Sequence, residues 1–142
     1  MIDVQVTVAD LDACSELTAA LRADGFREGE AFFYDLFHGM AECDPELRKL
    51  RMREPAGERR AILHIREQGR FNQRYALLFR DYLRASPRVR AEYELAKQRA
   101  AQLFPENIDG YLFLKEPVFH LIYEAASLWA EREGWAPDEE HL

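Results

Sequence analysis

The spacing of apolar residues changes once along the chain, close to residue 70. Before that point apolar and polar residues alternate in short runs, and Ile2 to Val8 alternates strictly, which is typical of a strand with one buried side. After Gly69 the apolar residues recur every three to four positions, which indicates helices. The chain is therefore expected to be an α+β protein, with a small sheet first and a helical half after it.

The first half is expected to add a helix and a hairpin to the opening strand. Apolar residues at helical spacing run from Leu11 to Leu21, with Asp10 placed to cap the helix and Gly25 to end it. Residues 26–46 give mixed signals, including a short aromatic run at 32–37, and predict a mobile loop. Residues 47–53 and 60–67 alternate again around a Pro-Ala-Gly turn, so they predict a hairpin and a mixed or antiparallel sheet.

The second half predicts three helices. The first ends before Pro87, and the second begins at Pro87 and ends at Phe104. The third is expected to follow Pro117 and to end at Gly134. The remaining tail, residues 135–142, carries an acidic run and is expected to be frayed.

Length and composition limit the class of protein. A chain of 142 residues fits one domain, expected over residues 1–134, and 48% hydrophobic with 32% charged residues excludes disorder. No apolar run reaches the roughly 18 residues that cross a bilayer, and Met-Ile-Asp does not begin a leader sequence. Cys14 and Cys43 lack metal-finger or disulfide-scaffold spacing. We therefore expect a cytoplasmic protein with reduced cysteines and no membrane partner.

The formal net charge of -7 is unevenly distributed. Residues 47–104 hold fifteen Arg and Lys and six acids, whereas the remainder holds four basic residues and twenty acids. A basic centre of this kind can attract small anions on an acidic protein. The alternative is a set of solvated helix faces paired with neighbouring Glu. Nucleic acid is not expected as a partner, because no groove-reading motif is present and the acidic ends would repel a long polyanion.

Three parts of the sequence resemble the GrpB family. The most specific is the run Phe-Arg-Asp-Tyr-Leu-Arg at residues 79–84, and it is followed by Pro87, Tyr93, Lys97, Tyr111 and Lys115. The opening Ile-Asp-Val-Gln-Val resembles the first core strand of that family, and His64 falls where the family has a histidine on a later strand. Together these parts cover nearly the whole chain.

The resemblance implies a nucleotidyltransferase-like fold, a relation to the domain fused behind dephospho-CoA kinase, and a metal–nucleotide site. In that superfamily a Gly-Ser turn cradles the triphosphate, and two carboxylates one residue apart on a strand share a divalent metal. Asp3 matches the first carboxylate, but Gln5 stands at the second, where it offers a neutral carbonyl. Mg²⁺ is the cofactor implied if the protein is catalytic. The Gly-Ser turn would precede Met1, so either the natural start is earlier or that region has been lost.

Asp3 and His64 are the candidate catalytic residues, and Asp3 is also the candidate metal ligand. The alternative for Asp3 is a surface or capping acid near a chain end. His64 could be a ligand or a phosphate donor, and it could equally be a hydrogen-bonded histidine in a partly apolar setting. Glu67 is a weaker candidate for a third acid, because alternation places it on the side of Leu63 and Ile65.

Arg80, Arg84 and Lys115 are the candidate phosphate-binding residues. Arg80 and Arg84 are four residues apart, so they share one helix face, and two guanidiniums suit bidentate recognition of phosphate. The alternative is an ion-pair network with Asp81 or with Glu92 and Glu94. The Phe and Tyr stripes of the helical half are interpreted as core and not as base-stacking surfaces.

Three hypotheses about function follow. The favoured one is a binding or accessory module for a nucleotide or another small phosphate-bearing ligand, with degraded transfer chemistry. The second is an active metal-dependent nucleotidyltransferase acting on a small molecule, against which Gln5 and the absent Gly-Ser turn count. The third is a structural domain that forms homodimers through the edge of its first strand.

Overall fold

The computed structural model describes residues 2–29 and 33–138 and divides the chain into two compact units. Unit 1 runs to Arg74 and also takes in the chain end from Asp138, and unit 2 is Tyr75–Pro137. The expectation of one domain over residues 1–134 stays a prediction.

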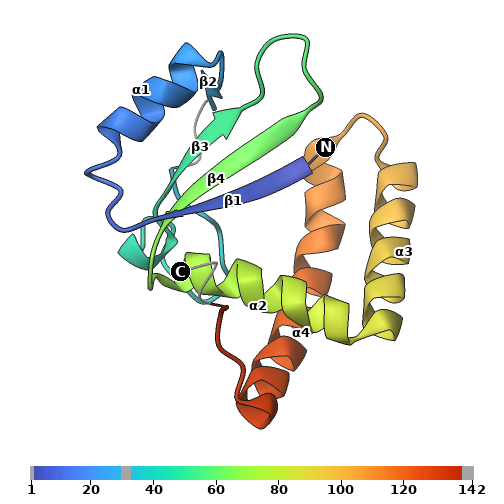
Figure 1. Ribbon diagram of the computed structural model, residues 1–142. Coiled ribbons are helices and arrows are strands. Elements are labelled where there is room, and N and C mark those ends of the chain that lie inside the picture. Colours follow the sequence, from blue (N-terminus) through green and yellow to red (C-terminus); the bar gives the residue numbers. More distant parts are fainter. Residues whose placement is uncertain (1, 30–32, 139–142) are drawn as a thin grey trace. The chain divides into compact units, whose positions relative to one another are not determined.

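Unit 1 is built on a four-stranded sheet in the order β1-β4-β3-β2 (Figure 1). The strands are β1 (Ile2–Val8), β2 (Arg27–Glu28), β3 (Lys49–Arg53) and β4 (Ala61–Glu67). β1 runs parallel to β4, whereas β3 runs antiparallel to both β4 and β2. The predicted first strand, the hairpin and the mixed sheet are therefore confirmed.

The core of unit 1 lies on one face of this sheet, where α1 (Ser15–Ala23) packs. Because alternate residues of a strand point to opposite faces, most apolar positions of the three long strands meet on that face. The buried members of the core are Leu11, Met52, Leu63 and Ile65, and Val6, Val8, Leu17, Leu21, Phe26 and Leu50 pack against them. The opposite face holds the polar residues of the same strands together with buried Ile62, which pairs with Asp3 and Arg53.

The start of α1 differs from the prediction. The helix begins at Ser15, Cys14 occupies the cap position, and no side chain caps it. The Asp10 carboxylate accepts a hydrogen bond from the backbone N–H of Asp12 at 2.8 Å instead. Asp10 therefore closes a turn ahead of the helix, and the prediction that it caps α1 was wrong.

Residues 26–46 contain more regular structure than the sequence suggested. Besides β2, the segment leads into a 3-10 helix at Pro45–Leu47, which Asp44 caps by accepting from the N–H of Glu46 at 2.9 Å. Tyr34 forms an isolated bridge with Arg48, and Asp35 is buried. Phe32, part of the predicted aromatic run, lies outside the described residues. The predicted loop is thus held to the sheet at several points.

Unit 2 consists of helices, and its aromatic residues pack on one another. The helices are α2 (Phe71–Ala85), whose first turn belongs to unit 1, α3 (Pro87–Leu103) and α4 (Ile108–Glu133). Ring centroids lie 4.6 Å apart for Phe79 and Phe119 and 5.4 Å apart for Phe79 and Tyr93. The interpretation of the aromatic stripes as core is confirmed for these rings, whereas Phe113 is 77% exposed. The predictions of α2 and α3 are confirmed by their bounds.

The prediction placed the start of the third helix too late. α4 starts at Ile108, where Asn107 accepts from the N–H of Gly110 at 3.0 Å, and it continues through Pro117. An internal proline removes one backbone hydrogen bond, and the buried residues of α4 all follow Pro117. Gly134 ends α4 at φ +65°, a left-handed conformation that glycine adopts readily. The helix end at Gly134 is therefore confirmed, whereas the start after Pro117 was wrong.

None of the described helices is both long and apolar enough to cross a membrane. Of the predicted frayed tail, residues 139–142 lie outside the described part of the chain.

Ile65 tests the core of unit 1. Its side chain is fully buried among Met52 and Leu63, so Ile65→Ala leaves a cavity and should lower the free energy of unfolding by about 2–5 kcal/mol. Leu36→Ala removes the same number of carbons from a side chain that is 61% exposed, and it should change stability by about 0.5 kcal/mol or less. Urea denaturation of both variants provides the measurement. Equal losses in the two would contradict the assignment of this core.

Candidate functional site

The register of the strands gathers polar side chains on the face of the sheet opposite the core. Gln5 pairs with His64, Arg51 pairs with His64, and Lys49 pairs with Arg66. Residues at paired positions share a face of the sheet. We call this the polar face, and its members are Asp3, Gln5, Lys49, Arg51, Arg53, His64 and Arg66.

A buried carboxylate organises one end of the polar face. Asp35 Oδ1 lies 2.5 Å from Lys49 Nζ, and Arg66 donates to both Asp35 oxygens, through Nε at 3.0 Å and through a terminal nitrogen at 3.1 Å. Asn72 donates to Asp35 Oδ2 at 3.1 Å and to the carbonyl of Arg48 at 2.8 Å. All four side chains belong to buried residues. The loop, two strands and the first turn of α2 therefore meet at one carboxylate.

The charges of this cluster shift the pKa values of its members. Burial acts to raise the pKa of Asp35, but Arg66 and Lys49 outweigh burial and lower it to about 2. Burial lowers the pKa of Lys49, although Asp35 opposes that change. The Asp35 carboxylate is consequently ionised at any neutral pH and balances the buried cations.

The structure brings Asp3 and His64 together on neighbouring strands. His64 Nε2 lies 3.6 Å from Asp3 Oδ1, and His64 Nδ1 lies 3.5 Å from Lys49 Nζ. The Asp3 side chain is 62% exposed, whereas that of His64 is 19% exposed. Asp3 and His64 are therefore close enough to belong to a single site. Their catalytic roles stay predictions. Glu67 lies elsewhere, since it accepts from the N–H of Leu11 at 3.2 Å and from Arg70 at 2.9 Å.

The residues of the polar face do not fit a divalent metal. Gln5 Oε1, the oxygen at the second ligand position, accepts a hydrogen bond from Arg66 at 2.7 Å. Gln5 Nε2 donates to the carbonyl of Gln73 at 3.2 Å, which fixes the amide in this orientation. Within residues 2–29 and 33–138, no group of three or more His, Cys, Asp or Glu could hold a metal ion. The oxygen at the second ligand position is therefore already held by a cation of the chain.

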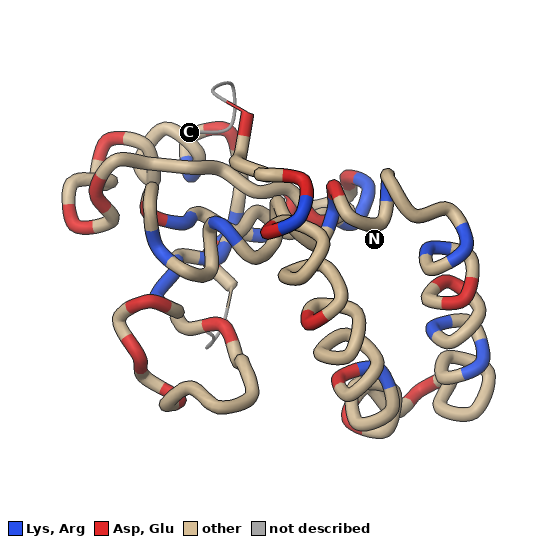
Figure 2. Tube along the Cα trace, turned by 90° about the horizontal axis from the view of Figure 1, so that it is seen from below, with Lys and Arg blue, Asp and Glu red and all other residues tan. Residues whose placement is uncertain are grey.

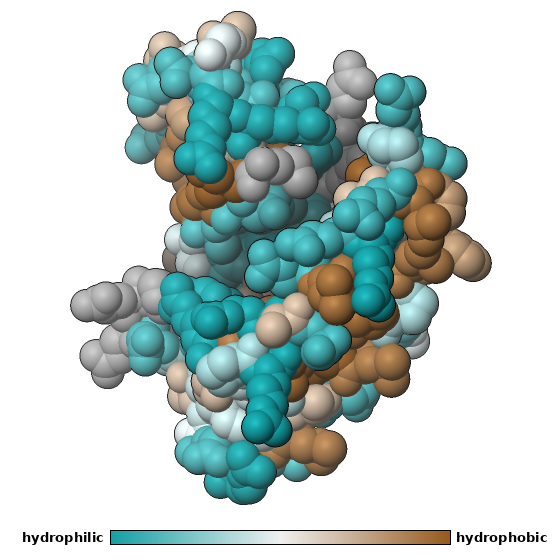
Figure 3. Space-filling model, turned by 90° about the vertical axis from the view of Figure 1, so that its right-hand side faces the viewer, coloured by the Kyte–Doolittle hydropathy of each residue, from teal (hydrophilic) through white to brown (hydrophobic). Residues whose placement is uncertain are grey.

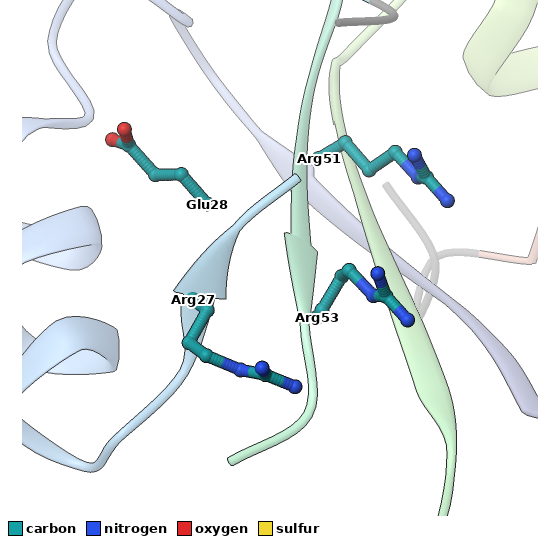
Figure 4. A pocket seen from close by; sticks show the side chains of 4 residues that line it. All are labelled: Arg27, Glu28, Arg51 and Arg53. Carbon is teal, nitrogen blue, oxygen red and sulfur yellow. The ribbon is translucent and has the colours of Figure 1, made fainter. Parts of the chain in front are cut away.

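The other end of the polar face borders a pocket lined by cations. Arg27, Glu28, Arg51 and Arg53 enclose about 460 Å³ at the edge formed by β2 and β3. Figure 4 shows the side chains of Arg51 and Arg53 extending side by side, whereas Glu28 points away on the other side of β2. Glu28 is paired with Arg22. The pocket thus contains three guanidiniums, and the carboxylate of Glu28 points away from Arg51 and Arg53.

Arg27 and Arg53 differ in the hydrogen bonds that their side chains make. Arg27 donates to the carbonyl of Glu54 at 3.2 Å and lies 3.6 Å from the Glu54 carboxylate. Arg53 Nε is buried and has no hydrogen-bond partner in the structure. A buried donor left unpaired is unfavourable, so an acceptor that reached Arg53 would relieve that cost.

Arg80 and Arg84 lie in unit 2, on α2, and both contact Asp81. Arg80 Nε lies 2.7 Å from Asp81 Oδ1, and an Arg84 terminal nitrogen lies 3.6 Å from the same oxygen. Trp135 Nε1 donates to the other Asp81 oxygen at 3.2 Å. Burial would raise the pKa of Asp81, but the hydrogen bonds from Arg80 and Trp135 lead the effects that lower it. These contacts match the ion-pair alternative, and phosphate binding by the pair stays a prediction.

Lys115 is half-buried on α4, a different helix from that of Arg80 and Arg84. Basic residues, blue in Figure 2, occur in both units, on the strands of the sheet and along α3. On α3 they are interspersed with acids, and Lys97 Nζ lies 4.9 Å from the centre of the Tyr93 ring. The basic centre seen in the sequence is therefore divided between a sheet and a set of helices.

Unit 2 also has an apolar groove. It encloses about 560 Å³ between α3 and α4, and Arg88 and Glu92 are the only charged side chains among its lining residues. Its wall includes Leu121, which is 73% exposed, and hydrophobic side chains (brown) are visible on the face of the molecule in Figure 3. With one basic and one acidic side chain, this groove does not match a phosphate.

Several residues of the polar face were missed by the sequence analysis. Lys49, Arg51 and Arg53 alternate with Leu50 and Met52, so the signal was present in the predicted hairpin. Arg66 likewise follows His64 by two residues on its strand. Asp35 carried no such signal, because it lies in a segment without periodicity and reaches Arg66 only through the fold.

Asp35 provides a test of the buried cluster. Asp35→Asn leaves Lys49 and Arg66 without their counter-charge, and it should lower the free energy of unfolding at pH 7 by about 3–5 kcal/mol. Because the pKa of Asp35 falls from 3.8 to about 2 on folding, its contribution is complete above about pH 4 and is lost as the pH falls through about 2. The variant should lack this part of the pH dependence.

The control for this prediction is Asp12→Asn. The Asp12 side chain is 71% exposed and pairs with Arg48 at the surface, so its loss should change stability far less than Asp35→Asn does. Chemical denaturation at a series of pH values measures both variants. If Asp35→Asn is no more destabilising than Asp12→Asn, the buried cluster is not a stabilising feature.

Comparisons with known proteins agree with the sequence resemblance. A family model described as GrpB protein matches residues 1–125. Dephospho-CoA kinase of Mycolicibacterium paratuberculosis is 37% identical over 147 residues, covering 96% of this chain and 36% of the kinase. The corresponding kinase of Mycobacterium tuberculosis is 33% identical over 96% of this chain and 36% of its own length. The UPF0157 protein YqkA of Bacillus subtilis is 28% identical over 91% of this chain and 34% of its own length.

The fold has a solved counterpart. The crystal structure of conserved protein GrpB from Enterococcus faecalis superposes with a TM-score of 0.65 at 23% identity, covering 89% of this chain and 70% of that one. The α+β fold, with a small mixed sheet and a helical carboxy-terminal half, is thereby confirmed and is consistent with a nucleotidyltransferase-like fold. The chain spans about a third of the length of the curated relatives it matches. On the family match and on the identity to these relatives, the chain belongs to the GrpB family.

Proposed function

We propose that this protein binds a small phosphate-bearing ligand in the pocket formed by Arg27, Arg51 and Arg53. The observation that carries the proposal is the side-by-side arrangement of Arg51 and Arg53, with Arg53 Nε buried and lacking a hydrogen-bond partner (Figure 4). Guanidiniums bind phosphate oxygens through paired hydrogen bonds. A phosphate group in this pocket would accept from the terminal nitrogens of Arg51 and Arg53, and it would reach the buried Arg53 Nε only if that side chain moved.

Arg51 and Arg53 on the sheet are better placed to bind phosphate than Arg80 and Arg84 on α2. Arg51 and Arg53 are two residues apart on a strand, so they emerge from the same face without needing a flexible segment to align them. Arg80 and Arg84 already share the Asp81 carboxylate, so a phosphate would have to compete with it. Arg80, Arg84 and Lys115 are retained as a second phosphate-binding candidate, and the experiment below separates the two.

Binding is proposed in preference to transfer chemistry. A nucleotidyltransferase needs metal-held carboxylates to orient the triphosphate. Here Gln5 accepts from Arg66, and Asp3 remains with His64 as its near neighbour. The protein is therefore proposed as a binding or accessory module, acting in the cytoplasm, and Asp3 and His64 remain the candidates if transfer activity exists.

The relatives suggest which ligands to examine. Several bear the name dephospho-CoA kinase, and this chain matches about a third of their length. Their name indicates a phosphoryl-transfer enzyme acting on dephospho-CoA. A ligand panel for this protein should accordingly include dephospho-CoA, CoA, nucleoside triphosphates and pyrophosphate.

A ligand from this panel should raise the melting temperature in the presence of EDTA. At one hundred times its dissociation constant a ligand stabilises the folded state by about 2.7 kcal/mol. In a chain of this size each kcal/mol raises the melting temperature by roughly 3 °C, so the expected shift is about 8 °C. Arg51→Gln with Arg53→Gln should abolish the shift, because two of the three guanidiniums of the pocket are lost and Arg27 is held by Glu54. Differential scanning calorimetry gives the melting temperatures.

Two further double variants serve as comparisons. Arg88→Gln with Arg90→Gln removes the same charge from exposed positions of α3 and should leave the shift intact. Arg80→Gln with Arg84→Gln examines the helix face, and loss of the shift there alone would assign the ligand to that face. If no member of the panel raises the melting temperature of the unaltered protein, phosphate binding is wrong.

Self-association through β1 is a second candidate function, favoured by the position of that strand. β1 pairs with β4 on one side, and its other edge pairs with none of the described strands. An edge of this length, seven residues, can accept a strand from another chain.

Light scattering checks the second candidate. The unaltered protein should show a dimer whose mass falls to that of a monomer in Thr7→Pro. The N–H of Ile2 donates to Arg60, so alternation directs the N–H of Thr7 to the edge away from β4, where proline removes a backbone donor. Circular dichroism of the same variant confirms that it remains folded. A strict monomer at high concentration would remove this candidate.

A further inference from the structure

We infer that the Arg66 guanidinium takes the position 5 oxygen that a divalent metal shared with position 3 would need, so that this protein carries a fixed cation in place of an exchangeable one. The inference concerns residues of the polar face, and it does not depend on phosphate binding. It has a specific consequence, which is that restoring a carboxylate at position 5 does not by itself create a metal site.

The first support is the direction of the two ligand positions. Residues 3 and 5 point to the same side of β1, as a shared metal would require. The Gln5 oxygen, however, faces an Arg66 terminal nitrogen at 2.7 Å. Asp3 Oδ1 faces His64 Nε2 at 3.6 Å. A nitrogen of another side chain therefore stands before each oxygen, and that of Arg66 is always charged.

The second support is the way in which Arg66 is held. Its residue is 5% exposed, and Asp35 binds it through two oxygens, at 3.0 and 3.1 Å. If a metal displaced the guanidinium, Arg66 would lose Gln5 as an acceptor and would have to move within a buried cluster. Close packing leaves little room for such a movement. The guanidinium is therefore a fixed part of the site.

The third support is the local balance of charge. Lys49 Nζ and the Arg66 guanidinium both contact the carboxylate of Asp35, so two buried cations lie on this part of the polar face. A divalent cation beside Gln5 would be repelled by both side chains, and the repulsion is strong where water is excluded. Asp3 provides the carboxylate at the first ligand position, and its side chain is 62% exposed.

Mn²⁺ binding tests the inference, because Mn²⁺ prefers the same oxygen ligands as Mg²⁺ and is detected directly by electron paramagnetic resonance. The full chain is titrated as the unaltered protein, as Gln5→Glu, and as Gln5→Glu combined with Arg66→Met. Each is repeated with Asp3→Asn, and only Mn²⁺ binding that Asp3→Asn removes is counted. This subtraction excludes ions held by acidic residues elsewhere on the surface.

We expect no Asp3-dependent Mn²⁺ binding in the unaltered protein or in Gln5→Glu, because the new carboxylate pairs with Arg66. The combined variant should bind one Mn²⁺ per chain, with at least a tenfold gain in affinity over Gln5→Glu. Asp3-dependent binding in the unaltered protein or in Gln5→Glu alone would overturn the inference. A folded combined variant that binds no Mn²⁺ would also overturn it.

Arg66→Met leaves Asp35 with Lys49 as its remaining buried cation, so the combined variant can lose stability. Circular dichroism establishes whether it is folded. If it is not, Arg66→Gln replaces Arg66→Met, because glutamine keeps a donor for Asp35 and removes the charge. Gln5→Glu preserves the size of the side chain and the acceptor for Arg66 but loses the donor to the Gln73 carbonyl, so circular dichroism is recorded for that variant as well. Phosphate plays no part in these titrations, so their outcome is separate from that of the proposed function.

Discussion

The buried carboxylate of Asp35 is the interaction on which the rest of unit 1 depends. It joins a loop to β3 through Lys49 and to β4 through Arg66, and Asn72 adds the first turn of α2. Buried cations need such a partner, because an unpaired charge in the interior is strongly unfavourable. The same carboxylate therefore determines how the loop passes over the sheet and in which direction Arg66 presents its remaining nitrogen. The conformation of Gln5, and with it the character of the polar face, follows from that direction.

The two faces of the sheet show how one periodic pattern produces both a core and a site. In β3 the apolar residues Leu50 and Met52 point to the core. Lys49, Arg51 and Arg53 alternate with them and point to the other face. Shifting the register by one residue would exchange the two sets. The site is thus specified by the same alternation that stabilises the sheet, and the pocket of Arg27, Arg51 and Arg53 is its outer edge.

Much of the fold was predictable because it rests on periodicity. The strand at residues 2–8, the hairpin, α2 and α3 all have strong local patterns, and each was found where it was expected. The start of α4 was missed because Pro117 was interpreted as a boundary, whereas Asn107 caps the helix further upstream. For the site, sequence analysis selected Asp3 and His64, which do lie together. It could not find Asp35, because no periodic signal marks a loop residue whose partners are fixed only by tertiary contacts.

The parallel pairing of β1 and β4 has a consequence for how the polar face forms. Ile2 pairs with Ala61, so the two strands are brought together across most of unit 1, whereas β3 and β4 are joined by a short turn. Closing a long segment costs more conformational entropy than closing a hairpin. The order of folding that this topology favours has the hairpin first and β1 last, an order that pulsed hydrogen exchange can establish. Lys49 and Arg66 would then be in place before Gln5 and Asp3 arrive, so β1 would dock onto a surface that already holds its cations.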